Sequence, residues 1–178
     1  MMHVLAFVGA SGSGKTTLIE HLILLFKDRG MLVSTVKNSH HSVEIDHPGK
    51  DSWRMKQAGS FEVVLVSDRS MSLQRTFERT SHMSIHEVIA QIYDGVDWIF
   101  VEGFKSSDLL KVEVIRPQVS SQNPLLFSDD FVVAVACSAT ADFPVPTALP
   151  VLPLDDPEAI AEWLIKNQDR FVYASPLP

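Results

Sequence analysis

The sequence predicts an α/β fold in which a mostly parallel sheet carries helices on both faces and holds a β-hairpin insertion. Short apolar runs alternate along the chain with segments of helical periodicity, which is the order that parallel strands and their crossover helices produce. The chain has 178 residues, with 46% hydrophobic and 21% charged residues, which suits one globular domain. The runs expected to form strands are residues 4–8, 31–36, 61–66, 98–101, 109–115 and 131–136.

A glycine-rich segment separates the first strand from the first helix. Residues 9–16, the phosphate loop, have the sequence GASGSGKT and complete the pattern GxxxxGK[ST]. Residues 17–29 follow with apolar side chains at helical spacing, and Gly30 is placed to end that helix. Between a strand and a helix, such glycines let successive backbone N–H groups converge on one anion, and the helix N-terminus adds unpaired donors. The segment therefore predicts a nucleoside triphosphate site.

Two side chains of the phosphate loop have expected roles in that site. Lys15 would reach the β- and γ-phosphates, and the Thr16 hydroxyl would ligate Mg²⁺. A carboxylate is also needed, and Asp97 and Glu102 flank the apolar strand 98–101. Ligands gather at the carboxyl ends of parallel strands, whereas Asp97 lies at the other end, about 16 Å back. Glu102 is therefore the predicted acid for the metal.

A polar segment, residues 37–51, follows the second strand and leaves the same rim of the sheet as the phosphate loop. Asp46 and Asp51 could ligate a metal or orient its water. The alternative is a solvated loop in which Asp51 only caps a helix at 52–58. A zinc site on the histidines of this segment is disfavoured, because adjacent histidines point apart on an extended chain and no cysteine is near. The donors suited to phosphate or another anion are Lys37, His40, His41 and Lys50.

Turn and cap signals place the hairpin and two further helices. The strand 61–66 and the alternating run 71–77 flank Asp68-Arg69, which predicts a hairpin. Ser84 is expected to begin a helix that continues to Tyr93. Asp156 followed by Pro157 is a strong start for the last helix.

The end of the chain has weaker signals. Residues 144–153 are expected to form a proline-punctuated connection. The domain is expected to cover residues 1–170. Residues 171–178 have no periodicity, so the sequence predicts a poorly ordered C-terminal tail there.

Charge and composition argue against several classes of protein. A formal net charge of −7 argues against a nucleic-acid partner, which needs clustered lysine and arginine. There is no apolar run of about 18 residues, so no membrane span is expected. The N-terminus lacks the layout of a signal peptide. The single cysteine, Cys137, excludes an intrachain disulfide and a cysteine-based zinc cluster. These features predict a cytoplasmic protein.

Five short motifs follow one another along the chain. They are GxxGxGKTT at 9–17, KxxHH at 37–41, DxPGKDS at 46–52, KxAG at 56–59 and VEGFK at 101–105. Together they resemble the MobB family, the adapter proteins of molybdopterin-guanine dinucleotide biosynthesis. The resemblance extends from about residue 4 to residue 163.

The resemblance implies a P-loop NTPase fold related to dethiobiotin synthetase and the metallocentre-assembly GTPases. It further implies GTP binding with slow, Mg²⁺-dependent hydrolysis, and a homodimer whose sheets join. The implied partner is the guanylyltransferase MobA, which attaches GMP to molybdenum-bound molybdopterin; molybdopterin or its guanine dinucleotide is an implied ligand.

The resemblance also assigns residues to these roles. Mg²⁺ would bind Thr16 and Glu102, and the catalytic candidates are Lys15, Glu102 and Asp46. The nucleotide would be held by Gly12, Ser13, Gly14, Lys15, Thr16 and Thr17. The side chains that would face the ligand or the pterin are Lys37, His40, His41, Asp46, Lys50 and Lys105.

Two other functions remain open on the residues alone. A small-molecule kinase could use the same phosphate loop, with Asp46 as base and Lys37 or Lys50 steering the acceptor. Such kinases usually add an arginine-rich lid, and only Arg75 and Arg79 form a nearby pair. A metallochaperone GTPase would carry its metal on histidines, but the chain has no histidine run. No Asn-Lys-x-Asp box is present, so the residues do not distinguish guanine from adenine.

Overall fold

The computed structural model describes residues 1–39, 43–116, 129–138 and 148–177. The chain forms two compact units. The first consists of Met1–Asn38 and Ser84–Pro178, and the second of Ser39–Met83. Within the described ranges, no helix is both long enough and apolar enough to span a membrane.

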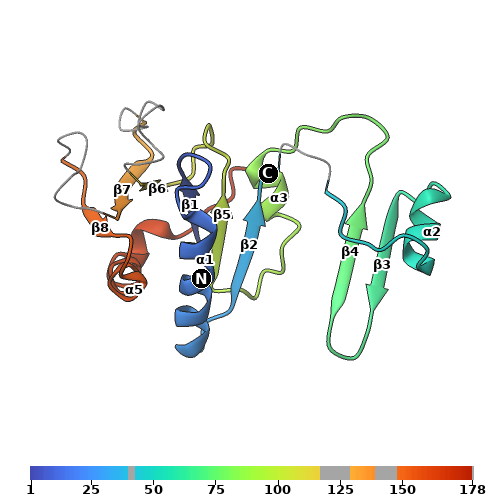
Figure 1. Cartoon of the computed structure of the whole chain (residues 1–178), viewed down its shortest axis with the longest axis horizontal. Coiled ribbons are helices and arrows are strands. Elements are labelled where there is room, and N and C mark those ends of the chain that lie inside the picture. The colour runs from blue at the N-terminus through green and yellow to red at the C-terminus, as the bar shows by residue number, and fades with distance from the viewer. Residues whose placement is uncertain (40–42, 117–128, 139–147, 178) are drawn as a thin grey trace. The chain divides into compact units, whose positions relative to one another are not determined.

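A six-stranded sheet forms the centre of the first unit (Figure 1). Its strand order is β2-β5-β1-β6-β7-β8, and every neighbouring pair is parallel. This confirms the prediction of an α/β fold with a mostly parallel sheet. The strands are β1 (His3–Val8), β2 (Val33–Lys37), β5 (Trp98–Glu102), β6 (Lys111–Ile115), β7 (Val132–Cys137) and β8 (Val151–Pro153).

Helices cover both faces of this sheet. Helices α1 (Lys15–Asp28) and α5 (Pro157–Lys166) pack on one face, where Phe26 contacts the rings of Trp98 and Phe100 in a buried cluster. On the other face, α3 (Ile85–Ile89) packs against apolar side chains of β1 and β5. The apolar periodicity of α1 and α5 therefore reflects one-sided burial against the sheet.

The predicted helix starts are present, although α3 is shorter than expected. Asp156 caps α5 by accepting a hydrogen bond from the Ala159 N–H at 3.1 Å. Ser84 and Glu87 form a reciprocal capping box at the start of α3. The helix ends at Ile89 rather than Tyr93, because the N–H groups of Gln91 and Ile92 bond three residues back instead of four, which tightens and closes the last turn.

Strand β6 lies between β1 and β7, and all five of its residues are buried. Lys111 on this strand is fully buried, a costly position for a charge. Its Nζ lies 2.8 Å from Asp129 Oδ2 and 5.0 Å from the centroid of the Phe131 ring, which compensates the lost hydration. The connection expected at 144–153 ends in β8, which pairs with β7; residues 144–147 lie outside the described ranges.

The second unit contains the predicted hairpin. Strands β3 (Glu62–Val66) and β4 (Met71–Arg75) pair in antiparallel register, and α2 (Asp51–Gln57) precedes them. The expected cap by Asp51 was wrong. Asp51 is the first helical residue, and its carboxylate lies 3.5 Å from Arg54 on the next turn. An acid in the first turn still interacts favourably with the helix dipole.

Within the first unit, the start of the C-terminal tail contacts the residues at the start of β1. The short 3₁₀ helix η3 (Gln168–Phe171) ends in the buried Phe171. Val172 then forms an antiparallel bridge with His3, and the Tyr173 N–H donates to the Met2 carbonyl at 2.9 Å. The aperiodic sequence of residues 171–178 contains no sign of these contacts, because they depend on distant partners.

Candidate functional site

The phosphate loop packs directly against the central sheet. Gly9 has a φ of +141°, and a Cβ atom there would lie 2.3 Å from the carbonyl oxygen of Val114 in β6. Gly12 and Gly14 also have positive φ, at +77° and +98°. A side chain at Gly9 would therefore both strain the backbone and collide with a neighbouring strand.

The loop presents backbone donors at the start of α1. Gly14 is the N-cap residue and has no side chain to satisfy the first helical N–H groups. The Leu18 N–H makes the first helical bond, to the Gly14 carbonyl at 2.9 Å. The N–H groups of Lys15, Thr16 and Thr17 precede that bond and have no partner within the helix. This is the arrangement that binds an anion at a helix N-terminus.

Ser13 is a further polar group within the loop. It is fully buried, and its Oγ has no hydrogen-bond partner among the described residues. Its N–H donates to the Ala10 carbonyl at 3.3 Å and closes the turn of the loop. A buried hydroxyl without a partner is costly, so its presence inside a loop of anion-binding donors fits a site for a polar ligand.

Lys15 folds back over the phosphate loop. Its Nζ donates to the carbonyls of Ala10 at 2.7 Å and Gly9 at 3.2 Å. Burial lowers the pKa of Lys15, the nearby Lys105 and Lys37 lower it further, and Glu102 opposes the shift. A bound polyphosphate would favour the charged ammonium and offer stronger acceptors than these carbonyls.

The structure brings together the two residues predicted to bind metal. Glu102 ends β5, which pairs with β1 so that Glu102 lies beside Phe7, just before the phosphate loop. The Thr16 Oγ1 donates to Glu102 Oε2 at 2.9 Å. A hydroxyl and a carboxylate at the mouth of a phosphate site fit Mg²⁺, which prefers oxygen ligands together with substrate phosphates.

Lys37 contacts the same two oxygen-bearing side chains. It ends β2 next to Glu102, and its Nζ lies 3.1 Å from Glu102 Oε1 and 3.4 Å from Thr16 Oγ1. Magnesium–oxygen distances are about 2.1 Å, so the ammonium and a metal ion cannot both lie between these oxygens. The side chain of Lys37 is 61% exposed, which leaves it room to move away when a metal binds.

A sharp turn follows Glu102 and leads to Lys105. Gly103 has a φ of +99°, and its N–H donates to the Phe7 carbonyl at 3.1 Å. Phe104 has a φ of +52°, which is uncommon for a residue with a side chain. Its ring packs against the buried cluster below α3, and this packing holds the strained turn in place.

The remaining predicted site residues lie elsewhere in the chain. His40 and His41 fall outside the described residues. Asp46 and Lys50 belong to the second unit, where Asp46 accepts the His47 N–H at 2.8 Å and Lys50 precedes α2. No group of three or more His, Cys, Asp or Glu side chains suited to a metal occurs in the part of the chain that the structure describes.

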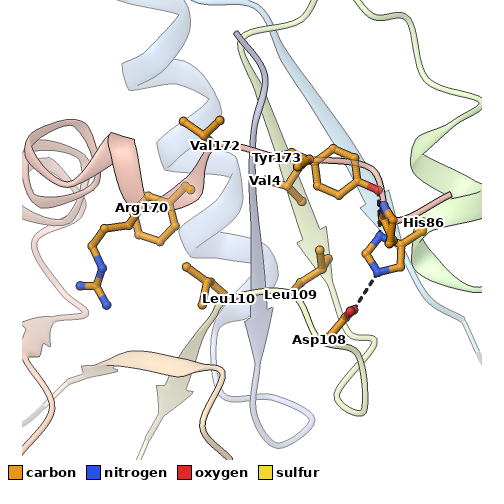
Figure 2. A pocket seen from close by; sticks show the side chains of 11 residues that line it. Val4, His86, Asp108, Leu109, Leu110, Arg170, Val172 and Tyr173 are labelled. Atoms are coloured by element: carbon orange, nitrogen blue, oxygen red, sulfur yellow. Dashed lines mark hydrogen bonds and ion pairs between the residues drawn. The ribbon is translucent and has the colours of Figure 1, made fainter. Parts of the chain in front are cut away.

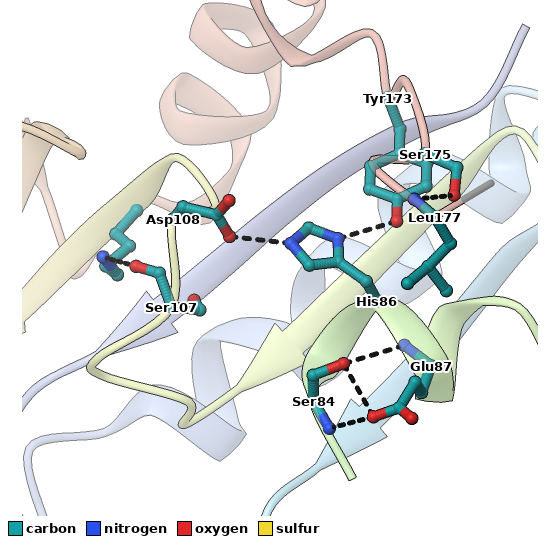
Figure 3. Close-up of polar contacts among 9 residues, drawn as sticks. Ser84, His86, Glu87, Ser107, Asp108, Tyr173, Ser175 and Leu177 are labelled. Carbon is teal, nitrogen blue, oxygen red and sulfur yellow. Dashed lines mark hydrogen bonds and ion pairs between the residues drawn. The ribbon is translucent and has the colours of Figure 1, made fainter.

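A hollow of about 280 Å³ lies near the amino-terminal end of β1 (Figure 2). On its edge, His86 Nε2 lies 2.7 Å from Asp108 Oδ1 and His86 Nδ1 lies 2.8 Å from the Tyr173 hydroxyl (Figure 3). The hydrogen bond to His86 lowers the pKa of Asp108, and burial raises the pKa of Tyr173. This cluster joins three distant segments, so no local sequence pattern could reveal it.

A comparison with known protein families shows which family this chain belongs to. The family model described as "Molybdopterin guanine dinucleotide synthesis protein B" matches residues 4–138. The chain belongs to the MobB family. The match covers the phosphate loop, the second unit and Glu102, and it confirms the family that the motifs indicated.

Named relatives agree with this membership. A "Molybdopterin-guanine dinucleotide biosynthesis adapter protein" of Haemophilus influenzae is 41% identical over 135 residues, which are 75% of this chain and 73% of that protein. The protein of the same name from Escherichia coli is 29% identical over 167 residues, which are 93% of this chain and 93% of that protein.

Solved MobB structures share the fold. A crystal structure of "molybdopterin-guanine biosynthesis protein B (mobB)" has a TM-score of 0.70 at 24% identity, covering 92% of this chain and 99% of that one. Bacillus subtilis MobB has a TM-score of 0.71 at 22% identity, covering 93% and 98%.

Proposed function

We propose that this MobB-family protein is a GTP-binding adapter that acts in the cytoplasm and assists the guanylyltransferase MobA in making molybdopterin-guanine dinucleotide. We propose further that it hydrolyses GTP slowly. The observation that carries the proposal is the convergence of Lys15, Thr16 and Glu102 at the mouth of the phosphate loop. Membership of a family whose relatives are named as adapters of this synthesis supports the pathway.

In the proposed complex, the residues of the phosphate loop bind the triphosphate. The N–H groups at the start of α1 surround the phosphates, and Lys15 neutralises their negative charge. Thr16 and Glu102 would hold Mg²⁺, which neutralises charge on the β- and γ-phosphates. Asp46, an acid within a family motif, remains a catalytic candidate that could orient a metal-bound water.

Selective thermal stabilisation tests the nucleotide proposal. A ligand that binds the folded protein but not the unfolded chain raises the apparent melting temperature. GTP with Mg²⁺ is expected to raise it more than ATP with Mg²⁺ at the same concentration. Equal shifts would contradict the choice of guanine, and no shift with either nucleotide would contradict the nucleotide site.

The pterin side of the proposal rests on the basic motif residues. Molybdopterin carries a phosphate, and Lys37, Lys50, Lys105 or a protonated histidine would give charge-assisted hydrogen bonds of about 1.5–3 kcal/mol each. Replacing His40 and His41 together by alanine is expected to leave GTP affinity near normal but to remove stimulation of the guanylyltransferase reaction. Both quantities can be measured with purified MobA and cofactor precursor. Full stimulation by the double variant would show that the adapter surface lies elsewhere.

We also propose a homodimer in which the second copy covers the hairpin of the second unit. Among the residues that the structure describes, the hairpin is only two strands wide. Val66 and Met71, which face each other across it, are 75% and 70% exposed. The opposed pair Val64 and Leu73 lies on the same face and is 47% and 50% exposed. Such a patch beside an unpaired strand edge is typical of an interface between chains.

Charged substitutions test this interface. Changing Val66 and Met71 to glutamate is expected to turn the dimer into a monomer, because two carboxylates would lose hydration at the contact. Sedimentation equilibrium measures the association state. The matched control is Leu24→Glu. Leu24 is an apolar residue of α1 whose side chain is 57% exposed, and its change to glutamate should leave the dimer intact. A double variant that still dimerises would place the interface away from the hairpin.

A further inference from the structure

Arg116 lies against the phosphate loop, although no motif marks it. It directly follows β6, at the same rim of the sheet as the loop. A Cβ atom at Gly14 would lie 3.2 Å from Arg116 Nε and 3.5 Å from Nη2, so the guanidinium rests on the bare backbone of Gly14. The side chain is 38% exposed, and its Nη2 lies 3.6 Å from Asp155 Oδ1.

In the absence of an anion, this is an unfavourable place for a positive charge. Gly14 is the N-cap residue of α1, where the helix dipole is positive, so the guanidinium lies at the positive end of that dipole. Asp155 offsets the conflict only in part, because its side chain is 61% exposed and exposed ion pairs are weak. An anion bound to the phosphate loop would replace this repulsion of Arg116 by attraction.

The topology of the sheet indicates which part of the nucleotide Arg116 would meet. Glu102 and Lys37 come from β5 and β2, on one side of β1. Arg116 follows β6, on the other side of β1. If Thr16 and Glu102 hold the metal between the β- and γ-phosphates, the phosphate chain crosses the loop away from β5. Arg116 then faces the nucleoside end of that chain.

We propose that Arg116 is a further nucleotide-binding residue, which donates hydrogen bonds to the α-phosphate. The inference rests on the proposed nucleotide binding and adds a residue to it. Arginine suits this position because its guanidinium stays charged at any physiological pH and its planar donors match phosphate oxygens. Because the contact involves neither the γ-phosphate nor the metal, it predicts the same gain in affinity for GTP and GDP, with or without Mg²⁺.

Affinity measurements on Arg116→Gln test the proposal. Titration calorimetry is expected to show about tenfold or more weaker binding of both GTP and GDP, as expected for loss of a charged hydrogen bond. The same factor is expected in Mg²⁺ and in EDTA. Arg116→Lys should restore part of the loss, since it keeps the charge but not the planar donors.

Two variants separate nucleotide binding from a structural role. Arg29→Gln removes an arginine of similar exposure, 31%, from the C-terminal end of α1, opposite the phosphate loop. Arg29 pairs with Glu158 of α5, and its loss should leave nucleotide affinity unchanged. Asp155→Asn removes the partner of Arg116 and should leave affinity unchanged or raise it.

Three results would overturn the proposal. Unchanged nucleotide affinity in a folded Arg116→Gln protein would make the residue a structural partner of Asp155 only. A loss confined to GTP would place it at the γ-phosphate instead. A wild-type protein that binds no nucleotide would overturn the proposed function itself, an outcome distinct from normal wild-type binding with an unaffected Arg116 variant.

Discussion

Replacing Lys15 by alanine is expected to abolish triphosphate binding and to leave the fold intact. Among the described residues, the ammonium bonds only to the carbonyls of Gly9 and Ala10, so its removal takes no packed side chain from the core. Its contacts with two phosphates would each be a charge-assisted hydrogen bond, and losing both weakens binding by roughly a hundredfold or more. Equilibrium dialysis with labelled GTP measures the loss, and circular dichroism measures the fold.

The last turn of α1 contains a matched control. Lys27→Ala removes the same charge from the same helix but at its opposite end, and should bind GTP normally. Lys15→Arg should bind GTP weakly, because the guanidinium is bulkier than the ammonium that folds back over the phosphate loop. GTP affinity in Lys15→Ala equal to that of the wild type would refute the nucleotide assignment.

Replacing Glu102 by glutamine is expected to lower GTP hydrolysis at least tenfold while changing affinity much less. The amide cannot neutralise Mg²⁺, whereas the backbone donors at the start of α1 still bind the phosphates. The variant also frees Lys37 from its ion pair, which adds a cation for the nucleotide and helps to preserve affinity. Single-turnover hydrolysis over a range of Mg²⁺ concentrations measures the effect, with the requirement for Mg²⁺ expected to rise.

Asp97→Asn is the control at the other end of the same strand. The Asp97 carboxylate accepts the Leu32 N–H at 2.7 Å, so the change perturbs β5 without touching the site. Hydrolysis should stay near that of the wild type. Normal turnover in Glu102→Gln would assign the metal to another acid, and Asp46 would be the first to test.

Local sequence patterns were enough to predict the loop, strands and helices that surround the candidate site. The glycines of the phosphate loop are dictated by backbone geometry, because Gly9 tolerates no side chain against Val114. The caps at Ser84 and Asp156 act within one helical turn, so their partners are near in sequence. Glu102 could be chosen over Asp97 because all strands of a parallel sheet place their carboxyl ends at one rim.

Other features were decided only by the tertiary structure. Strand order places Lys37 beside Glu102 and Arg116 beside Gly14, although 65 and 102 residues separate them in the sequence. Lys111 is buried because β6 lies between β1 and β7. The alternation of polar and apolar residues along β6 did not indicate this central position. Local periodicity reports which face of an element is buried, but it has no information about which elements become neighbours. Thus local motifs were enough to predict the phosphate loop and the position of Glu102 beside it, whereas packing between distant segments decided which cations surround them.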